Sequence, residues 1–311
     1  MRNIRRAAAL LLILSLAMPF TGLAAGEKNK LGLPTGNLVG FDGGSTWFGE
    51  DFAYDITDEE ACWALLQKPI TVLNVGENEL VYPRVSPDGE KVVNEWQGGS
   101  INGSLAAVHV LGEDEDGWTL IEGLDYYDRV IRGYVKTSLL KTVTPNKKYG
   151  IIIDKLYQRL YMFVDGKLWS SCAVSTGLVN EEQPYNETAT GEYLVGSWVG
   201  GFDSEGMYCE MGIRFNGGDL LHQVPYVERA DGTKDFAKYG SQLGRKASHG
   251  CVRVARTAND EGLCIKWLWE NLKKNTKVIV WDDDGRTLPY PDDDLPLYYN
   301  PDGGSSYPST P

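Results

Sequence analysis

The chain has 311 residues, of which 42% are hydrophobic, and this is enough for two packed cores. Its 36 glycines, 17 tyrosines and 9 tryptophans favour β structure with many turns. The formal net charge of −13, with no basic cluster to offset it, argues against a nucleic-acid or anionic-membrane partner.

Residues 1–25 have the pattern of a signal peptide. Three arginines within the first six residues precede an apolar run at 7–20, and the small residues Ala24 and Ala25 follow. The run is shorter than the ~20 residues that a membrane span needs. We therefore expect cleavage after Ala24 or Ala25, export as a secreted protein, and no membrane attachment after cleavage.

An exported protein with five cysteines has at least one that is unpaired. We expect Cys251 to be free. Cys172 and Cys209 either form a disulfide or remain buried thiols, and the sequence leaves both possibilities open. Cys62 and Cys264 lie within helical patterns and are expected in the core.

Residues 26–69 are expected to form a polar lead followed by a short helix. The lead is rich in glycine and polar residues. Thr57-Asp58-Glu59-Glu60 has the capping-box pattern that opens a helix, and Pro69 requires the helix to end before it.

Residues 70–143 are predicted to form a small β-barrel domain. Short β-prone runs are separated by turn signals such as Asp88-Gly89 and Asp116-Gly117. The predicted strands are 71–75, 79–85, 107–111, 118–122 and 130–135. His109 falls within one of them and is interpreted as structural.

Gly117-Trp118, followed by Gly133-Tyr134-Val135, resembles bacterial Src-homology-three-like domains. That resemblance implies a domain that binds a wall component. The alternative is a β spacer without a ligand.

Residues 147–282 form a second predicted unit after a linker at 144–146. We expect a helix over 257–271, capped at Thr257, with Cys264, Trp267, Leu268 and Leu272 on one face. Residues 283–311 are acidic and rich in proline, which predicts a disordered or loosely attached tail. The predicted strands are 149–154, 158–164, 167–174, 191–198, 211–215, 219–224 and 277–281.

Ser248-His249-Gly250-Cys251 is the stretch with the clearest chemistry. It holds one of three histidines and one of five cysteines in the chain. A thiol is mostly protonated near neutrality and needs a base to become the attacking thiolate. His222 and His249 are the two histidines of this unit, and either could take the proton.

Several segments together resemble the L,D-transpeptidase catalytic domain of the YkuD type. The resemblance covers residues 147–282. It is carried by His222, Leu243-Gly244, Ser248-His249-Gly250-Cys251-Val252-Arg253, Gln158-Arg159-Leu160-Tyr161-Met162 and Val174-Ser175-Thr176-Gly177.

The resemblance implies roles for individual residues. Cys251 would be the nucleophile and His222 the proton donor and acceptor, with the carbonyl of Gln223 orienting the imidazole. His249 would line the pocket, and the amides of His249, Gly250 and Cys251 would form the oxyanion hole. Ser248 and Arg253 would shape the cysteine loop and its substrate contacts.

The implied fold and reaction follow from the same resemblance. We expect a mostly β protein: a β-sandwich catalytic domain with one main helix after the cysteine loop, preceded by the small barrel. The implied activity is the cross-linking of peptidoglycan stem peptides through a cysteine thioester, with release of D-alanine. No cofactor or metal is needed, and we expect a monomer.

The chain departs from the family pattern in two places. Thr188-Ala189-Thr190-Gly191 stands where the family usually has Thr-Pro-x-Gly, so the rigidity of the proline is lost. The interval between His222 and Ser248 holds 25 residues, which is longer than usual. The extra length is expected as an enlarged surface loop within 228–238.

Other readings of the same residues stay open. The alternatives for the whole protein are an L,D-carboxypeptidase, in which water opens the thioester, and a catalytically silent wall-binding protein. His222, His249 and Cys251 could instead be zinc ligands. A papain-like peptidase fits poorly because its cysteine precedes its histidine, and no acidic pair stands out for glycoside hydrolysis.

Overall fold

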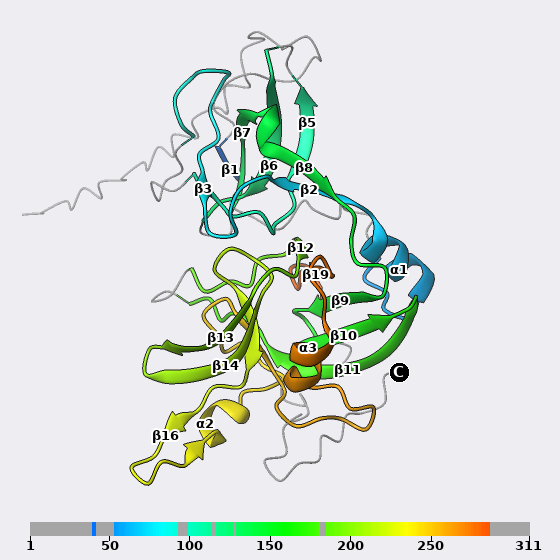
Figure 1. The fold of residues 1–311 in the computed structure, drawn as a ribbon, viewed down its shortest axis with the longest axis vertical. Helices are drawn as coiled ribbons and strands as arrows, with labels where there is room; N and C mark the ends of the chain where they lie inside the picture. Colours follow the sequence, from blue (N-terminus) through cyan, green and yellow to red (C-terminus); the bar gives the residue numbers. More distant parts are fainter. Residues whose placement is uncertain are drawn as a thin grey trace, which may run out of the picture.

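The computed structural model describes residues 39–41, 53–92, 99–113, 116–126, 129–180 and 185–286. These residues form two β units, and the prediction of a mostly β fold is confirmed (Figure 1). The predicted signal peptide and residues 287–311 of the predicted tail lie outside the described residues. Within the described part of the chain, no helix is long and apolar enough to cross a membrane.

The N-terminal unit has a four-stranded sheet in the order β1-β7-β6-β5, with the two-stranded pairs β2-β8 and β3-β4. The predicted strand at 79–85 is reduced to a two-residue strand because Pro83 has no N–H for a ladder. A likeness to Src-homology-three domains remains a prediction. The elements are β1 (Val39–Phe41), β2 (Ile70–Leu73), β3 (Leu80–Val81), β4 (Ile101–Asn102), β5 (His109–Glu113), β6 (Trp118–Leu124), β7 (Val130–Lys136), a 3-10 helix η1 (Thr137–Leu139) and β8 (Leu140–Val143).

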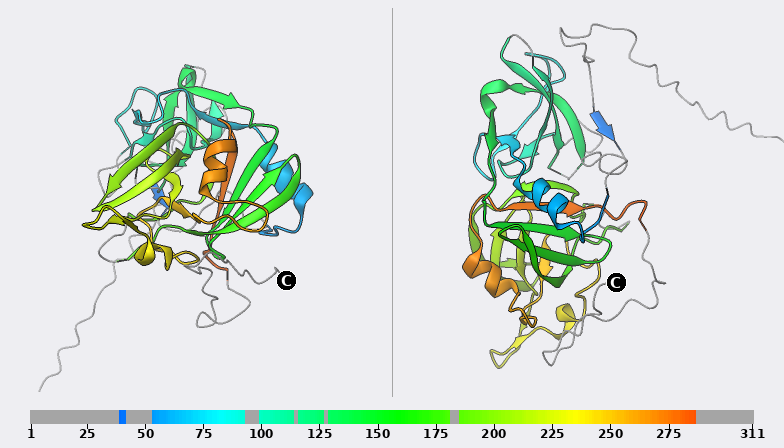
Figure 2. Two further views of the ribbon diagram at one scale, coloured as in Figure 1. Left: turned by 60° about the horizontal axis from the view of Figure 1, so that its bottom comes forward. Right: turned by 90° about the vertical axis from the view of Figure 1, so that its right-hand side faces the viewer.

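Helix α1 (Glu59–Gln67) lies between β1 and β2 of the N-terminal unit in sequence but packs on the second unit (Figure 2). The side chain of Asp58 caps it by accepting from the Ala61 amide, which agrees with the predicted start. Its buried face is Cys62 and Leu66, which pack in one cluster with strands of the second sheet. The helix therefore covers one face of the second sheet.

The second unit is built on one nine-stranded sheet in the order β12-β19-β9-β10-β11-β18-β15-β14-β13. The sheet bends around α3, so that its two halves face each other (Figure 2). The strands are β9 (Tyr149–Asp154), β10 (Arg159–Val164), β11 (Lys167–Ser175), β12 (Gly191–Leu194), β13 (Trp198–Ser204), β14 (Met207–Arg214), β15 (Leu220–Gln223), β16 (Val227–Glu228), β17 (Lys234–Asp235), β18 (Val252–Val254) and β19 (Lys277–Trp281); the helices are α2 (Ala237–Gly240) and α3 (Ile265–Asn271).

The helix predicted over 257–271 is wrong in its first half. Helix α3 has 7 residues and is shorter than α1, and Cys264 rather than Thr257 precedes it. Gly262 has φ +94°, a left-handed conformation that breaks a helix, and the Asn259 side chain accepts from the Leu263 amide to close a turn there. Cys264, Leu268 and Leu272 are buried, and Leu268 and Leu272 pack in the same core cluster, but only Leu268 lies within the helix.

Cys172 and Cys209 are both free and buried, which is the second of the two possibilities that the sequence leaves open. The first residues after β19 are held in place: the ammonium of buried Lys155 lies 3.0 Å from Asp282 and 3.6 Å from Asp283. The predicted surface loop at 228–238 is the β16–β17 hairpin followed by the start of α2.

The two units are joined by backbone hydrogen bonds. The Ala107 amide donates to the Glu192 carbonyl at 2.8 Å, and the Leu194 amide donates to the Leu105 carbonyl at 2.9 Å. Residues 105–107 thus extend the nine-stranded sheet beyond its edge strand β12. A small apolar cluster that includes Val72 and Leu194 fills the seam beside these bonds.

Candidate active site

The cysteine loop, residues 248–251, is fixed by buried hydroxyls and backbone bonds. The Ser248 amide donates to the Thr176 carbonyl at 3.0 Å, and the Ser248 hydroxyl donates to the Cys251 carbonyl. Buried Thr188 bridges two segments, because its hydroxyl donates to the Gly250 carbonyl at 2.6 Å and accepts from the Gly177 amide at 2.8 Å. The loop is therefore held from both sides before any substrate binds.

Gly250 is required by both conformation and space. Its φ is +114°, which L side chains rarely adopt. A Cβ at this position would lie 2.6 Å from Oδ1 of Asp219. The amides of His249, Gly250 and Cys251 donate to no other described residue, so they are available to a ligand.

Strand register places Cys251 and His222 on one face of the sheet. Strands β15 and β18 run parallel with Leu221 opposite Val252 and His222 opposite Arg253. One residue earlier, the Leu220 amide donates to Sγ of Cys251 at 3.4 Å. Because side chains two residues apart share a face, Cys251 projects on the same side as Arg253, and therefore as His222.

His222 is buried and held in one tautomer. Its Nδ1 lies 2.7 Å from the Gln223 carbonyl oxygen, which can only accept, so Nδ1 carries the proton and Nε2 is the basic nitrogen. The ring also meets Phe202 edge-on, with ring centroids 5.4 Å apart. The pKa of His222 is lowered to about 4, mainly by burial; the hydrogen bond with the Gln223 carbonyl opposes the shift, and nearby Arg253 adds to it. The imidazole is thus neutral near pH 7.

The thiol of Cys251 is protonated at rest. Burial raises its pKa to about 12, and the neighbouring Asp219 carboxyl contributes to the shift. Asp219 is itself buried, and this raises its pKa to about 7, against a hydrogen bond from the Asn216 amide. The site is therefore not a preformed thiolate–imidazolium pair. A proton has to leave the sulfur as the sulfur attacks.

A cavity of about 260 Å³ opens at Cys251. From the second unit, Cys251, His249 and Asp219 line it, together with the turn between β14 and β15. Nδ1 of His249 lies 3.5 Å from a carboxylate oxygen of Glu205. The opposite wall comes from the N-terminal unit and includes Tyr126.

The remaining predicted site residues, which are Arg253, Gln223 and Ser248, do not line the cavity. Arg253 is buried, donates to Oε1 of Gln242 at 2.6 Å and does not line the cavity. The side chain of Gln223 faces Glu210, and only its carbonyl serves His222. The Ser248 hydroxyl is used within the loop. The structure thus places Cys251 and His249 at the cavity and His222 on the adjacent strand β15, and neither His222 nor Arg253 lines that cavity.

Sequence reasoning missed three contributors to the site. Asp219 precedes His222 by three residues and was assigned only to a strand. In the sequence, the segment at Thr188 stands out only because it lacks the proline that is usual in the family. In the structure, the Thr188 hydroxyl holds the cysteine loop. The wall from the N-terminal unit had no local signal, because it depends on how the two units pack.

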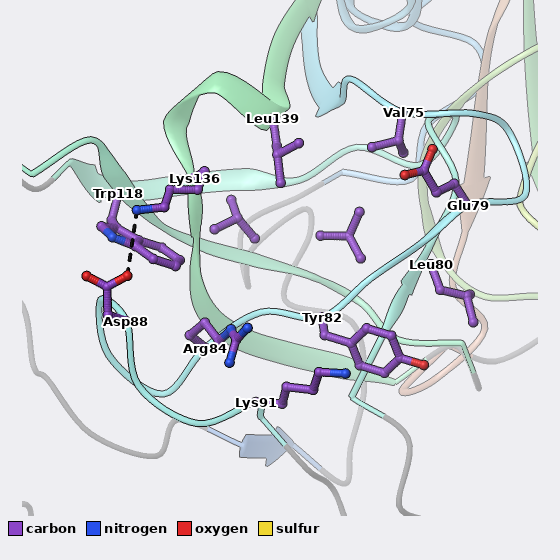
Figure 3. Close-up of a pocket in the computed structure, with 12 residues that line it drawn as sticks. Val75, Glu79, Leu80, Tyr82, Arg84, Asp88, Lys91, Trp118, Lys136 and Leu139 are labelled. Atoms are coloured by element: carbon purple, nitrogen blue, oxygen red, sulfur yellow. Dashed lines mark ion pairs between the residues drawn. The ribbon is translucent and has the colours of Figure 1, made fainter.

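A second cavity, of about 490 Å³, lies wholly in the N-terminal unit (Figure 3). Lys91 sits 3.8 Å from the ring centroid of Tyr82, and Lys136 sits 3.9 Å from that of Trp118. Lys136 also lies 3.8 Å from Asp88. None of the predicted catalytic residues lines this cavity.

Metal ligation was one alternative for the histidine–cysteine stretch. Across the ranges that the structure describes, no three His, Cys, Asp or Glu side chains are grouped as a metal would need.

Residues 148–280 match the family model named YkuD, the L,D-transpeptidase catalytic domain. This part of the chain therefore resembles the YkuD catalytic domain. The match contains the cysteine loop, His222 and the segments that fix them. The resemblance expected for residues 147–282 is confirmed, while the domain boundaries and the role of each residue remain predictions.

Similar proteins carry the same description. The protein YciB of Bacillus subtilis (strain 168), whose name describes it as an L,D-transpeptidase, is 30% identical over 143 residues, which are 43% of this chain and 66% of YciB. An L,D-transpeptidase structure from Stackebrandtia nassauensis is 22% identical, with 46% of this chain and 60% of that chain covered and a TM-score of 0.33.

A structure from Mycobacterium tuberculosis H37Rv covers 80% of this chain and 96% of its own at 14% identity, also with a TM-score of 0.33. TM-scores this low describe a partial superposition and add nothing to the assignment. The chain covers 66% of YciB and 60% of the Stackebrandtia chain, which is less than two thirds of each.

Replacing Gly250 by alanine is expected to lower the free energy of unfolding by about 2–4 kcal/mol and to prevent acylation of the Cys251 thiol. The new Cβ would clash with Asp219 and twist the loop that carries the amides. Denaturant unfolding measures the stability. Acylation of the Cys251 thiol by a β-lactam reports whether the loop amides keep their positions.

Gly262→Ala is the matched control, since Gly262 has φ +94° but no atom within 4 Å of the added Cβ. It should cost about 1–2 kcal/mol from backbone strain alone and leave acylation intact. Equal losses in the two variants would contradict a special role for the Gly250–Asp219 contact.

Proposed function

We propose that this chain is an exported cysteine transpeptidase that cross-links peptidoglycan stem peptides. The proposal is supported by two features of the segment that matches the YkuD model: Cys251 lies at a cavity, and His222 on the adjacent strand β15 has its Nε2 left basic by the Gln223 carbonyl. Export is supported by the basic and apolar start of the sequence. We further propose that the protein acts as a monomer.

The first half-reaction forms a thioester. The Cys251 thiol gives its proton to Nε2 of His222 while the sulfur attacks the carbonyl carbon that precedes the terminal D-alanine. The tetrahedral oxyanion is held by the loop amides, each worth about 3–4 kcal/mol. The C–N bond then breaks, His222 returns the proton to the leaving amine, and D-alanine departs.

The second half-reaction transfers the peptide. A side-chain amine of a neighbouring stem loses a proton to His222 and attacks the thioester carbonyl. The C–S bond breaks, and the proton on His222 restores the thiol. Water in place of the amine would give a carboxypeptidase, so exclusion of water from the cavity decides between the two outcomes.

The test is to incubate the purified chain with tetrapeptide-stem wall fragments and to analyse the products by mass spectrometry. We expect cross-linked dimers together with one free D-alanine for each dimer. D-alanine without dimers would replace the transpeptidase with a carboxypeptidase. Wall binding with neither product would leave only a silent binding protein.

A further inference from the structure

Residues 282–286, which follow β19, are ion-paired with two segments that adjoin the cysteine loop. Nζ of Lys246, two residues before the loop, lies 2.5 Å from Oδ2 of Asp283. Nζ of Lys155, which follows β9, lies 3.0 Å from Asp282 and 3.6 Å from Asp283. The family model matches residues 148–280, so these aspartates lie just beyond the match.

Lys155 links residues 282–283 to the contact that fixes Gly250. The Lys155 side chain is 4% exposed, and its ammonium also lies 2.6 Å from Oε1 of Glu187. Burial opposes the charged form of Lys155, but the three carboxylates around it outweigh burial and raise its pKa, so the ammonium stays charged. The residue after Glu187 is Thr188, whose hydroxyl donates to the Gly250 carbonyl. A chain of ion pairs and one hydrogen bond therefore ends at the cysteine loop.

A second connection starts at Arg286. Its guanidinium donates to both carboxylate oxygens of Asp154, at 3.1 Å and 2.8 Å, and Asp154 also accepts from the amides of the turn that follows β9. That turn ends at Gln158, whose side chain donates to the Thr176 hydroxyl at 2.7 Å and accepts from the Thr176 amide at 2.9 Å. The Thr176 carbonyl is the acceptor for the Ser248 amide. Arg286 thus supports the start of the cysteine loop.

These contacts bear on the reaction through the position of the loop. None of residues 282–286 lines the cavity at Cys251, so they do not contact a ligand there. The amides of residues 249–251 stabilise an oxyanion only while they are held at the right place, and a small displacement of such donors lowers the rate. A loop that is tied to residues 282–286 at two points has less freedom to move.

We propose that the charged side chains of residues 282–286 are positioning groups for the reaction, with Asp283 and Arg286 holding the cysteine loop in the geometry that accepts the oxyanion. The working unit then includes the start of the segment after β19. The inference rests on the proposed function, because it assigns residues that act on the same loop.

A double-mutant cycle on the Lys246–Asp283 pair tests the proposal. The full chain and its Asp283→Asn, Lys246→Gln and doubly substituted variants are mixed with a carbapenem, and acylation is followed by time-resolved intact-mass spectrometry. Each single substitution should lower the acylation rate constant about three- to tenfold and change the affinity of the initial complex by less than about twofold. The double variant should be no slower than the slower single variant, because both substitutions break the same pair.

Asp284→Asn is the matched control, because Asp284 is an exposed acid of the same segment that forms none of these ion pairs. It should be acylated at the wild-type rate. Asp283→Glu keeps the carboxylate and should recover most of the rate that Asp283→Asn loses. Thermal unfolding should be the same for Asp283→Asn and Asp284→Asn, since Asp283 is only partly buried.

Amide hydrogen exchange gives a measurement that does not depend on the reaction. A peptide that covers residues 244–252 should exchange faster in Asp283→Asn than in Asp284→Asn, because the Ser248 amide loses its fixed acceptor more often. The proposal is overturned if the acylation rate and the exchange are both unchanged in Asp283→Asn, if the two single effects add in full, or if Asp284→Asn is equally slow.

The two proposals fail separately. A wild-type chain that is not acylated and releases no D-alanine, with faster loop exchange in Asp283→Asn, removes the reaction but keeps the positioning role. Acylation and D-alanine release by the wild-type chain, undiminished in Asp283→Asn and Lys246→Gln, remove the positioning role alone.

Discussion

Cys251→Ala is expected to abolish D-alanine release, with a drop in kcat/KM of at least about 10⁴-fold, and to prevent covalent acylation by a β-lactam. The reason is that the proposed reaction forms its thioester on this sulfur, and no other cysteine lines the cavity. Intact-mass spectrometry after exposure to a carbapenem measures the adduct directly. We expect one adduct on the wild-type chain and none on the variant.

Cys209→Ala is the matched control. Burial raises the pKa of Cys209 to about 12, as it does for Cys251, and both thiols are unpaired. They differ in access, since Cys251 lines the cavity and Cys209 does not. An adduct that persists in Cys251→Ala, or disappears in Cys209→Ala, would show that access to this cavity does not select the nucleophile.

Strands with a local signal were predictable from sequence. Strands β9 and β19 have the predicted bounds, because each is a run of buried β-branched residues between turn signals. The hairpin of β10 and β11 turns at Asp165 and Gly166, both with positive φ, where a Asp-Gly pair predicted it. The order of the strands in the sheet had no such signal, because it depends on long-range pairing.

Where local patterns compete, tertiary contacts decided the outcome. Thr257 and Asp260 have the spacing of a helix start, but Gly262 and the Asn259 turn place residues 257–264 in a loop. The predicted strand at 191–198 divides because the chain leaves β19 at Leu194 and reaches β14 only from Trp198 onward. Neither the loop at 257–264 nor the break in the predicted strand at 191–198 could be predicted from a window of a few residues.

In the candidate site, too, some residues could be predicted from the sequence and others could not. The histidine–cysteine pair could be predicted because few residue types can carry that chemistry. Asp219 and Asp125 could not, because an acidic side chain is common and only the packing of two units brings this pair to one cavity. The shifts in pKa of Cys251 and His222 also arise from burial, which a sequence does not specify.

His222→Ala is expected to lower kcat by about 10³-fold and to change the shape of the pH profile. In the wild-type chain, His222 with a pKa of about 4 is a neutral base above pH ~5, so kcat/KM should rise through about pH 4 and then stay level to about pH 8. Without that base, attack depends on the small thiolate fraction of a thiol with a pKa of about 12. The rate of the variant should then rise about tenfold per pH unit between pH ~6 and ~9.

Stability has to be followed beside the rate, since burial of a neutral imidazole links folding to pH. The unfolded chain takes up the His222 proton near pH ~6.5 and the folded chain only near 4, so the stability that this residue contributes is present above pH ~6.5 and lost as the pH falls through about 4. Circular dichroism at each pH separates unfolding from the loss of the base.

His249→Ala is the matched control. His249 lines the cavity, but among the described residues no carbonyl fixes its tautomer. This variant should keep the level pH profile. A level profile for His222→Ala, with the slope appearing instead in His249→Ala, would move the base to His249.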